Sequence, residues 1–415
     1  MDDRGKLYPR CIRANIEAAL ADTPVVCLLG PRQCGKTTLV RSFEPKRTYV
    51  SLDEEALLAT ARDDPSGFVA ALQGPVILDE VQRAPALLQA LKIAVDRDRQ
   101  PGRFLLTGSA NLLLLSQVSE SLAGRMEIVH LHPLTEAEKE RRPGAFLSAF
   151  LTGKLRARVN AEAEISAVSL PSRILAGGYP EPLLRPAERA RQWRRQYLQT
   201  LIGRDVQDIA RIREPEAVAR FLELLSHRTA ELLNTSGLAS DIGINRETVE
   251  RYLAILERLF LIRRLPAWHR NEARRLVKAP KIHLVDSGLA AALSGLQEVD
   301  WLERRDQFGH LLESFVIQQI IAQAGWTDSD LRFWHYRDKD QVEADLVITR
   351  GRQVWGIEVK ASTTVNPADG RGLRRLADQS GKDFQGGILI YAGTSSLALG
   401  DARLLAVPLS LLWGM

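Results

Sequence analysis

Two groups of residues could together handle phosphate and a metal ion, and the first of them lies at residues 30–37. These residues read Gly-Pro-Arg-Gln-Cys-Gly-Lys-Thr, which is the spacing of a phosphate-binding loop. Glycines let the backbone approach phosphate oxygens, Lys36 carries a charge to the β- and γ-phosphates, and Thr37 offers Mg²⁺ a hydroxyl. We therefore predict that ATP and Mg²⁺ bind through Gly30, Pro31, Arg32, Gln33, Cys34, Gly35, Lys36, Thr37 and Thr38.

Two adjacent acids, Asp79 and Glu80, follow an apolar segment at residues 75–78. The carboxyl ends of parallel strands meet at one edge of a sheet, so acids at the end of such a strand belong beside a phosphate loop. Asp79 is then placed to bind Mg²⁺ together with Thr37. Glu80 is placed to act as the general base that polarises an attacking water molecule.

Positioning these groups requires a parallel sheet with helices between its strands. Hydrophobic patterning predicts strands at 47–52, 75–80 and 103–109, and a helix at 55–72 that breaks near Pro65. The polar end of the 103–109 strand should lie between the strand that precedes the loop and the strand that precedes the acids. The pattern as a whole predicts an α/β fold.

Five motifs stand in order in the first third of the chain, namely GPRQCGKTT, ILDEVQ, LLTGSAN, SLAGRM and HLHPLTEAE. Through them, residues 20–135 resemble the prokaryotic AAA+-like ATPases, whose members typically carry a nuclease-like C-terminal region. The resemblance implies an enzyme that hydrolyses ATP, with a P-loop AAA+ core at 1–135 and a helical lid or linker at 136–220. It also implies a homo-oligomer, for which a hexameric ring is one arrangement.

The same resemblance implies further residues of the ATPase site. Asn111, or else Ser109, corresponds to the sensor residue near the γ-phosphate and the water. Arg125 corresponds to an arginine finger, which reaches the nucleotide of a neighbouring subunit; a surface arginine is the alternative. The candidates for a second sensor in the lid are Arg191, Arg194 and Arg195.

Residues 238–265 have the pattern of two helices followed by a strand. Gly243 marks a turn, and Asn245 is suited to cap a longer helix whose apolar residues share one face. The pattern resembles a winged helix-turn-helix, whose second helix enters the DNA major groove, and we place this domain at 221–295. Contact with a protein is the alternative use of such a domain. The predicted DNA-binding residues are Arg246, Arg251, Arg258, Arg263 and Arg264.

Positive charge is concentrated in the same part of the chain. The net charge of the protein is +5, and residues 185–275 hold 18 Arg against 12 Asp and Glu, which accounts for the whole surplus. Such a segment is the electrostatic footprint of a nucleic-acid surface. Solvated helix faces with ion pairs have the same composition, so the count alone does not decide between them.

Four residues of the last third have the pattern of a metal-dependent nuclease. Glu313 lies in a helical segment, Asp345 in an alternating strand, and Glu358 and Lys360 two positions apart on the next strand, where side chains share a face. The pattern resembles PD-(D/E)xK nucleases, nearest to archaeal Holliday-junction resolvases, and predicts a restriction-endonuclease-like α/β domain at 296–415. The resemblance implies that Asp345 and Glu358, with Glu313, bind Mg²⁺ while Lys360 positions water. A binding module that does not cleave is the alternative.

Composition limits the class of protein. With 415 residues, 45% hydrophobic and 26% charged, the chain is expected to form several domains of ordinary globular composition. Its apolar runs are shorter than a membrane span, its first residues lack a signal peptide, and its three cysteines suggest neither a disulfide framework nor a zinc site. We expect a cytoplasmic protein that does not enter a membrane.

Two functions fit these predictions. In the first, an oligomeric ATPase moves or remodels branched, Holliday-junction-type DNA, and its C-terminal domain has a possible Mg²⁺-dependent nuclease activity. In the second, nucleotide binding gates a regulatory switch of a toxin–antitoxin or defence type, which works through protein partners. We favour the first, because phosphate contacts from an arginine-rich surface supply the sequence-independent affinity that a DNA motor needs.

Overall fold

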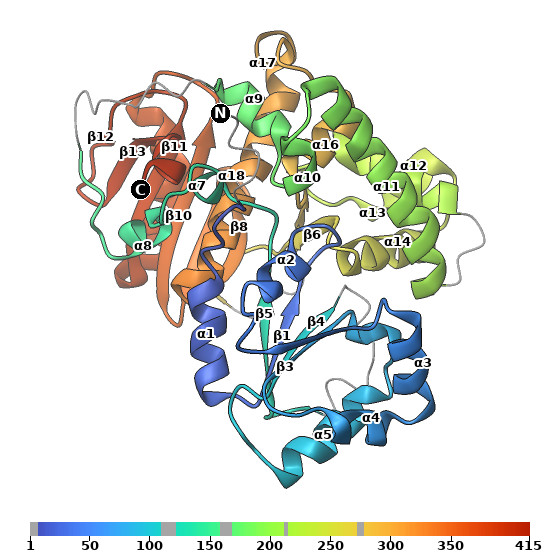
Figure 1. Cartoon of the computed structure of the whole chain (residues 1–415). Coiled ribbons are helices and arrows are strands. Elements are labelled where there is room, and N and C mark those ends of the chain that lie inside the picture. The colour runs from blue at the N-terminus through green and yellow to red at the C-terminus, as the bar shows by residue number, and fades with distance from the viewer. Residues whose placement is uncertain (1–6, 109–121, 158–167, 211–214, 272–277) are drawn as a thin grey trace. The chain divides into compact units, whose positions relative to one another are not determined.

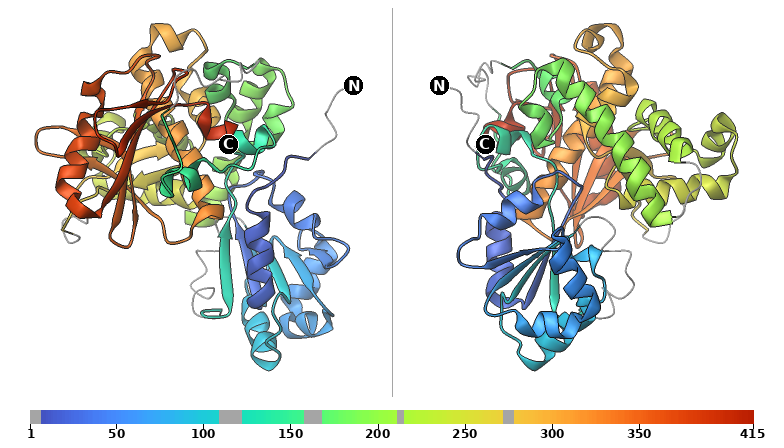
Figure 2. Two further views of the ribbon diagram at one scale, coloured as in Figure 1. Left: turned by 90° about the vertical axis from the view of Figure 1, so that its left-hand side faces the viewer. Right: turned by 45° about the vertical axis from the view of Figure 1, so that its right-hand side comes forward.

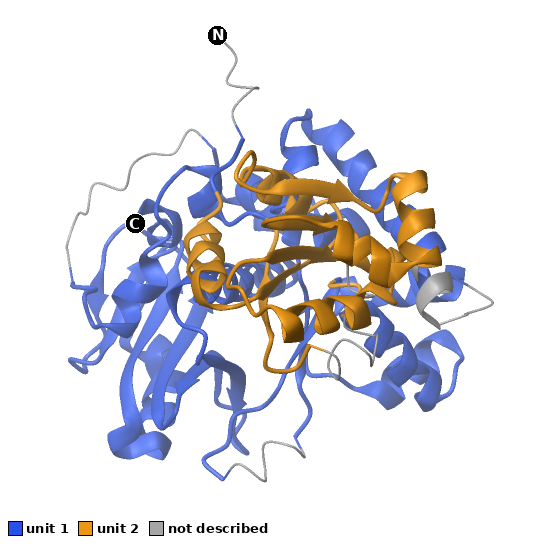
Figure 3. Ribbon diagram, turned by 60° about the horizontal axis from the view of Figure 1, so that its bottom comes forward, with its two compact units in different colours: residues 1–9, 134–257, 261–415 blue, residues 10–133, 258–260 orange. Residues whose placement is uncertain are grey.

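The structure is a computed structural model of the whole chain, and it describes residues 7–108, 122–157, 168–210, 215–271 and 278–415. The chain forms two compact units (Figure 3). The N-terminal unit consists of Arg10–Pro133 and Arg258–Phe260, and the C-terminal unit of Met1–Pro9, Leu134–Glu257 and Leu261–Met415. The predicted lid or linker, winged helix and nuclease-like domain after residue 135 all lie in the C-terminal unit, and the boundaries between them stay a prediction.

The N-terminal unit contains a sheet of five parallel strands in the order β2-β3-β4-β1-β5 (Figure 1). Strand β4 thus lies between β1 and β3, which confirms the predicted placement. The strands are β1 (Val25–Leu29), β2 (Thr48–Ser51), β3 (Val76–Asp79), β4 (Phe104–Gly108) and β5 (Met126–His130). The helices are α1 (Arg13–Asp22), α2 (Lys36–Arg41), α3 (Glu55–Asp63), α4 (Pro65–Ala71), the short 3₁₀ helix η1 (Val81–Arg83) and α5 (Leu87–Arg97).

The central strands of this sheet are apolar because both of its faces are covered by helices. All residues of β1, β3 and β4 are buried. Helices α3, α4 and α5 share one hydrophobic core with the strands, and α1 lies on the opposite side of the sheet (Figure 2). The predicted break in the 55–72 helix is confirmed, since Asp64 caps α4 by accepting a 2.8 Å hydrogen bond from the Gly67 N–H.

The C-terminal unit begins with helices and continues into a second sheet. Its helical part comprises α7 (Glu136–Lys139), α8 (Phe146–Leu151), α9 (Leu170–Ala176), α10 (Pro180–Leu183), α11 (Ala187–Ala210), α12 (Pro215–His227), α13 (Thr235–Ile242), α14 (Arg246–Arg258), α16 (Ser287–Ser294) and α17 (Asp300–Glu303). Among the described residues, every helix is too short or too polar to cross a lipid bilayer.

Helices α13 and α14 form the predicted helix pair. Gly243 ends α13 with a φ of 68°, and the Asn245 side chain caps α14 by accepting a 2.8 Å hydrogen bond from the Thr248 N–H. Strands β6 (Ile262–Leu265) and β7 (Lys281–Leu284) follow as an antiparallel pair.

The chain after β6 is joined to the second sheet. The Trp268 N–H donates to the His335 carbonyl at 2.6 Å, and the His335 N–H donates to the Pro266 carbonyl at 2.9 Å. A wing that projects freely into solvent would leave these backbone groups to water. The segment that follows β6 is therefore hydrogen-bonded to the second sheet at its start.

The second sheet has six strands in the order β12-β13-β11-β10-β9-β8. Strands β8, β9 and β10 are antiparallel neighbours, whereas β11 is parallel to β10 and to β13. The strands are β8 (Arg332–Arg337), β9 (Glu343–Arg350), β10 (Gln353–Lys360), β11 (Phe384–Tyr391), β12 (Leu397–Ala398) and β13 (Leu404–Pro408). The accompanying helices are α18 (Arg305–Thr327), η3 (Pro367–Gly370), α19 (Arg371–Ser380), η4 (Gly381–Asp383) and α20 (Leu411–Gly414).

Candidate active site

The predicted phosphate loop connects β1 to α2 at the carboxyl edge of the parallel sheet. Gly35 precedes α2 with a φ of +101°, which a residue with a Cβ rarely adopts. Gly30 is required for a different reason, because a Cβ there would lie 2.2 Å from the Leu131 carbonyl oxygen. The loop thus needs one glycine for its backbone conformation and the other for close packing against the chain that follows β5.

Lys36 is buried at the start of α2, with only 5% of the residue exposed. Its Nζ donates to the carbonyls of Gly30 and Pro31, both at 2.9 Å, so the ammonium lies across the loop. Arg10 supports the loop from outside the motif, donating to the Cys34 carbonyl at 2.8 Å. The sequence analysis missed Arg10, because it bonds to backbone carbonyls and belongs to no motif.

Asp79 ends β3 and accepts hydrogen bonds from three hydroxyl groups. Its Oδ2 accepts from Thr37 Oγ1 at 2.9 Å and from Tyr49 Oη at 2.6 Å, and its Oδ1 accepts from Thr107 Oγ1. Only 2% of Asp79 is exposed. The two predicted metal ligands, Thr37 and Asp79, are therefore in contact although 42 residues separate them.

Tyr49 and Thr107 are members of this site that the sequence analysis did not identify. They lie on β2 and β4, the two strands beside β3. Burial, reinforced by the hydrogen bond to Asp79, raises the pKa of the Tyr49 hydroxyl, which therefore remains a donor at neutral pH. The only signal was a hydroxyl side chain on each of two strands, and it could not reveal the shared partner.

Glu80 has a left-handed backbone, with a φ of 60° and a ψ of 42°. This conformation costs a residue other than glycine roughly 1–2 kcal/mol. The backbone is held by a 3.1 Å hydrogen bond from the Glu80 N–H to Thr107 Oγ1, and the carboxylate accepts from Gln82 Nε2. Thr107 thus connects both acids to the neighbouring strand β4.

The structure fits the Mg²⁺ that the sequence predicts here. In nucleotide sites Mg²⁺ takes few protein ligands and receives the others from phosphate and water. Thr37 and Asp79 offer two such oxygens next to the loop. We assign them as the residues that would hold the ion.

Arg125 lies away from the phosphate loop, and the candidates for the first sensor lie outside the described residues. Asn111 and Ser109 belong to the segment 109–121, which the structure does not describe. The Arg125 carbonyl accepts from the Val25 N–H at the start of β1, so Arg125 lies at the edge of the sheet opposite the loop. Its guanidinium donates to the carboxylate of Asp96, and this hydrogen bond lowers the pKa of Asp96. The finger role concerns a neighbouring subunit and stays a prediction.

The predicted DNA-binding arginines fall into two groups. Arg246, Arg251 and Arg258 on α14 are exposed. Arg263 is half-buried and donates to Gln318 at 2.6 Å. Burial lowers its pKa to about 10.

Arg264 is also committed to partners within the protein. It forms ion pairs with Glu257 at 2.5 Å and with Glu250 at 3.0 Å, and the hydrogen bond with Glu257 raises its pKa. The strand arginines therefore hold β6 to its neighbours, and only the helix arginines offer charge to a ligand.

Of the second-sensor candidates, Arg194 is the most buried. It donates to the Ala176 carbonyl, and burial lowers its pKa. Arg195 donates to the Ala292 carbonyl at 3.4 Å, and Arg191 is half-buried on the same helix, α11. These contacts place all three within the C-terminal unit.

The acids of the nuclease-like pattern surround a lysine that the sequence analysis did not single out. The Nζ of Lys281, on β7, lies 2.8 Å from Glu313, 3.3 Å from Glu343 and 3.6 Å from Asp345. The Lys360 Nζ lies 3.1 Å from Glu358 Oε1. The described part of the chain contains no group of three or more His, Cys, Asp or Glu residues arranged to hold a metal ion. The structure thus brings Glu313 and Asp345 together around an ammonium group.

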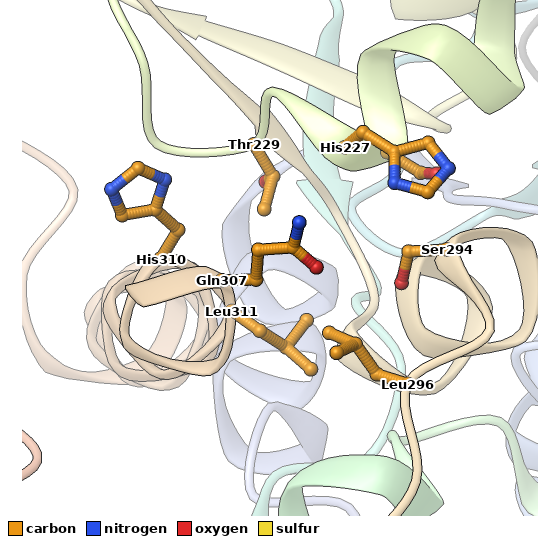
Figure 4. A pocket seen from close by; sticks show the side chains of 8 residues that line it. His227, Thr229, Ser294, Leu296, Gln307, His310 and Leu311 are labelled. Carbon is orange, nitrogen blue, oxygen red and sulfur yellow. The ribbon is translucent and has the colours of Figure 1, made fainter. Parts of the chain in front are cut away.

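A small pocket lies between α12, α16 and α18 (Figure 4). Its volume is about 10 Å³, which is near the minimum that holds one water molecule. It cannot accommodate a nucleotide. The residues that line it are Ser226, His227, Thr229, Ser294, Leu296, Gln307, His310 and Leu311.

Three segments of the chain match known protein families. Residues 22–139 match the AAA domain family. Residues 168–300 match a domain of unknown function (DUF8612), and residues 308–412 match another (DUF4143). The family matches therefore assign a class to the N-terminal unit and no function to the later segments.

Among solved structures, the Walker-type ATPase PABY2304 of Pyrococcus abyssi is 18% identical with a TM-score of 0.40, over 69% of this chain and 99% of that one. The RuvB Holliday junction branch migration motor of Thermotoga maritima is 16% identical with a TM-score of 0.28, over 64% and 94% of the two chains.

Two curated mycobacterial proteins match over nearly the whole chain. The uncharacterized proteins Rv2008c of Mycobacterium tuberculosis and Mb2031c of Mycobacterium bovis are each 32% identical over 399 residues, which is 95% of this chain and 82% of theirs. The chain therefore belongs to the family of these two uncharacterized proteins, and its residues 22–139 match the AAA domain family.

Proposed function

We propose that the protein binds ATP with Mg²⁺ and hydrolyses it at the edge of the parallel sheet. The contact between Thr37 and Asp79 carries this proposal, because it unites the phosphate loop with the strand acid. A bound Mg²⁺ would neutralise developing charge on the phosphates. Lys36 would bind the β- and γ-phosphates, and Glu80 would accept a proton from the attacking water. Phosphate release from ATP by the purified protein, and its loss in the Lys36→Ala variant, tests the proposal.

Tyr49 is expected to position Asp79 for this reaction. The Tyr49→Phe variant removes a 2.6 Å hydrogen bond to Asp79 and keeps the ring, over which the Arg41 guanidinium lies at 4.5 Å. A lost hydrogen bond to a charged group is worth about 1.5–3 kcal/mol. We therefore expect kcat/KM for ATP at limiting Mg²⁺ to fall by about one to two orders of magnitude.

Steady-state kinetics at several Mg²⁺ concentrations, together with the thermal midpoint, measure this effect. A purely structural hydroxyl would lower the thermal midpoint and leave the Mg²⁺ dependence of turnover as in the wild type. That result would remove Tyr49 from the positioning role.

We further propose that the partner of the ATPase is DNA, and that the protein is an oligomeric motor or remodeller of branched DNA. Two observations support this. Arg246, Arg251 and Arg258 are exposed on α14, the second helix of a capped helix pair, as in a winged helix-turn-helix. The order of α18, three antiparallel strands, α19 and a parallel strand agrees with a nuclease-like fold for the second sheet. In the proposed oligomer, Arg125 would exchange Asp96 for the nucleotide of a neighbouring subunit.

The double variant Arg246→Ala/Arg251→Ala is expected to weaken DNA binding uniformly across sequences. Each lost phosphate contact reduces the slope of log affinity against log salt by about 1. Titration of a four-way junction, a duplex and a single strand at several salt concentrations measures the slope. Arg352→Ala, an exposed arginine in the turn between β9 and β10, is the matched control. A double variant with the slope of the control would exclude α14 as the DNA contact.

The second candidate function is a nucleotide-gated switch that acts through a protein. The observation that favours it is the mixed charge of α14, where Glu250 and Glu257 engage Arg264 and Glu247 lies exposed beside Arg246. Such a surface suits a protein partner better than a polyanion. ATP turnover that is unchanged by all three DNA forms, combined with weak and equal binding to each, would favour the switch.

A further inference from the structure

A buried ionic cluster of the C-terminal unit lies where α18, β7 and β9 meet. Lys281 is 4% exposed, and its ammonium contacts Glu313, Glu343 and Asp345 at 2.8 to 3.6 Å. These carboxylates belong to a helix and a strand, and each lies at least 32 residues further along the chain than Lys281. Removing a charge from water is costly, so buried ions are retained only with close partners.

The charges of this cluster depend on one another. Burial alone would lower the pKa of Lys281, but the nearby carboxylates of Glu313, Asp345 and Glu343 outweigh it and raise the pKa. Burial and the charge of Asp345 raise the pKa of Glu313 to about 8, despite its contact with Lys281. One ammonium is thus shared among three acids, and burial favours the protonated form of one of them, Glu313.

Beside this cluster, Glu358 is also held by a lysine and a neighbouring acid. Its Oε1 pairs with Lys360, whereas its Oε2 is buried and accepts no hydrogen bond from the described residues. Burial and the charge of Asp345 raise the pKa of Glu358. The Asp345 Oδ2 in turn accepts a 2.8 Å hydrogen bond from the Val359 N–H, next to Glu358. A cation beside Asp345 therefore also interacts electrostatically with the Glu358 carboxylate.

We propose that the Lys281 ammonium takes the place of the metal ion that the sequence pattern predicts for Glu313, Asp345 and Glu358. The Lys281 nitrogen lies 2.8 Å from Glu313, to which it is hydrogen-bonded, and 3.6 Å from Asp345, with which it forms an ion pair. The described residues hold no ready set of metal ligands. The wild-type protein then has no divalent ion at this cluster and does not cleave DNA there. This inference is independent of the proposed ATPase activity, because Lys281 and its partners lie in the C-terminal unit.

The test compares the wild type with the Lys281→Met variant, which keeps the bulk of the side chain and removes its charge. Both are unfolded thermally without nucleotide, in EDTA and in millimolar MnCl₂. The wild-type midpoint should not change, whereas Mn²⁺ should raise the midpoint of the variant by about 2–4 °C or more, because the ion replaces the missing charge. Lys281→Arg, which keeps a cation, should be as insensitive to Mn²⁺ as the wild type.

Two controls separate the outcomes. If Mn²⁺ stabilises the wild type and Asp345→Asn removes that effect, the metal binds beside Lys281 and the proposal is wrong. A Lys281→Met protein that folds but ignores Mn²⁺ also overturns it, as does a variant that yields no folded protein with Mn²⁺ or with EDTA. Mn²⁺-dependent nicking by the wild type that is lost in Asp345→Asn would contradict it directly.

Discussion

Replacing Lys36 with alanine is expected to abolish ATP binding. Hydrogen bonds to charged groups contribute about 1.5–3 kcal/mol each, and Lys36 would supply them to two phosphates, so the dissociation constant should rise by more than about 100-fold. Turnover should fall below detection as a consequence. Binding of a fluorescent ATP analogue and phosphate release measure the two effects.

The same substitution also affects the folded protein. Lys36 donates to the carbonyls of Gly30 and Pro31, and alanine leaves both without this donor. Some loss of thermal stability is therefore expected, and the binding assay must be run well below the new midpoint. Lys46→Ala changes an exposed lysine of the same unit and serves as the matched control. ATP binding by Lys36→Ala within a few-fold of that control would show that the loop does not bind phosphate.

Replacing Glu80 with glutamine is expected to separate binding from turnover. An amide cannot accept the proton of the attacking water, and loss of a general base typically costs 10² to 10⁴ in rate. The amide oxygen can still accept the hydrogen bond that Gln82 donates to the carboxylate, so the local geometry should persist. We expect ATP affinity near that of the wild type and turnover lower by about two to four orders of magnitude.

Single-turnover measurement of ATP cleavage, alongside equilibrium binding, checks this result. Glu55→Gln, an exposed acid at the start of α3, is the matched control for the loss of one charge. Turnover in Glu80→Gln equal to that of Glu55→Gln would remove Glu80 from the role of base. Loss of both binding and turnover would instead assign Glu80 a part in holding the nucleotide.

The centre of the N-terminal unit could be predicted because its chemistry is encoded locally. The loop at residues 30–37 and the acids after residue 78 each lie at the end of an apolar strand, and parallel strands bring their carboxyl ends to one edge of the sheet. Tyr49, Thr107 and Arg10 could not be predicted. Their roles arise from hydrogen bonds to groups 24 or more residues away, and no short spacing records such contacts.

The later part of the chain shows the same limit more strongly. The patterns of α14 and of the nuclease-like strands gave correct elements, but the charges on them have other partners than expected. Arg264 forms ion pairs with two acids of the preceding helix α14. Lys281 lies in a segment expected to form part of a winged helix. An ion pair depends on which elements the fold places side by side, and residue types alone do not reveal that.

At position 80, where the backbone is left-handed, folding stability and catalysis favour different residues. Glycine adopts this conformation without strain, and a glycine there would make the turn after β3 easier to form. It would also remove the carboxylate on which hydrolysis is proposed to depend. The chain therefore gives up some folding free energy to keep an acid at this turn. A relative with glycine at this place would be more stable and would bind ATP without hydrolysing it.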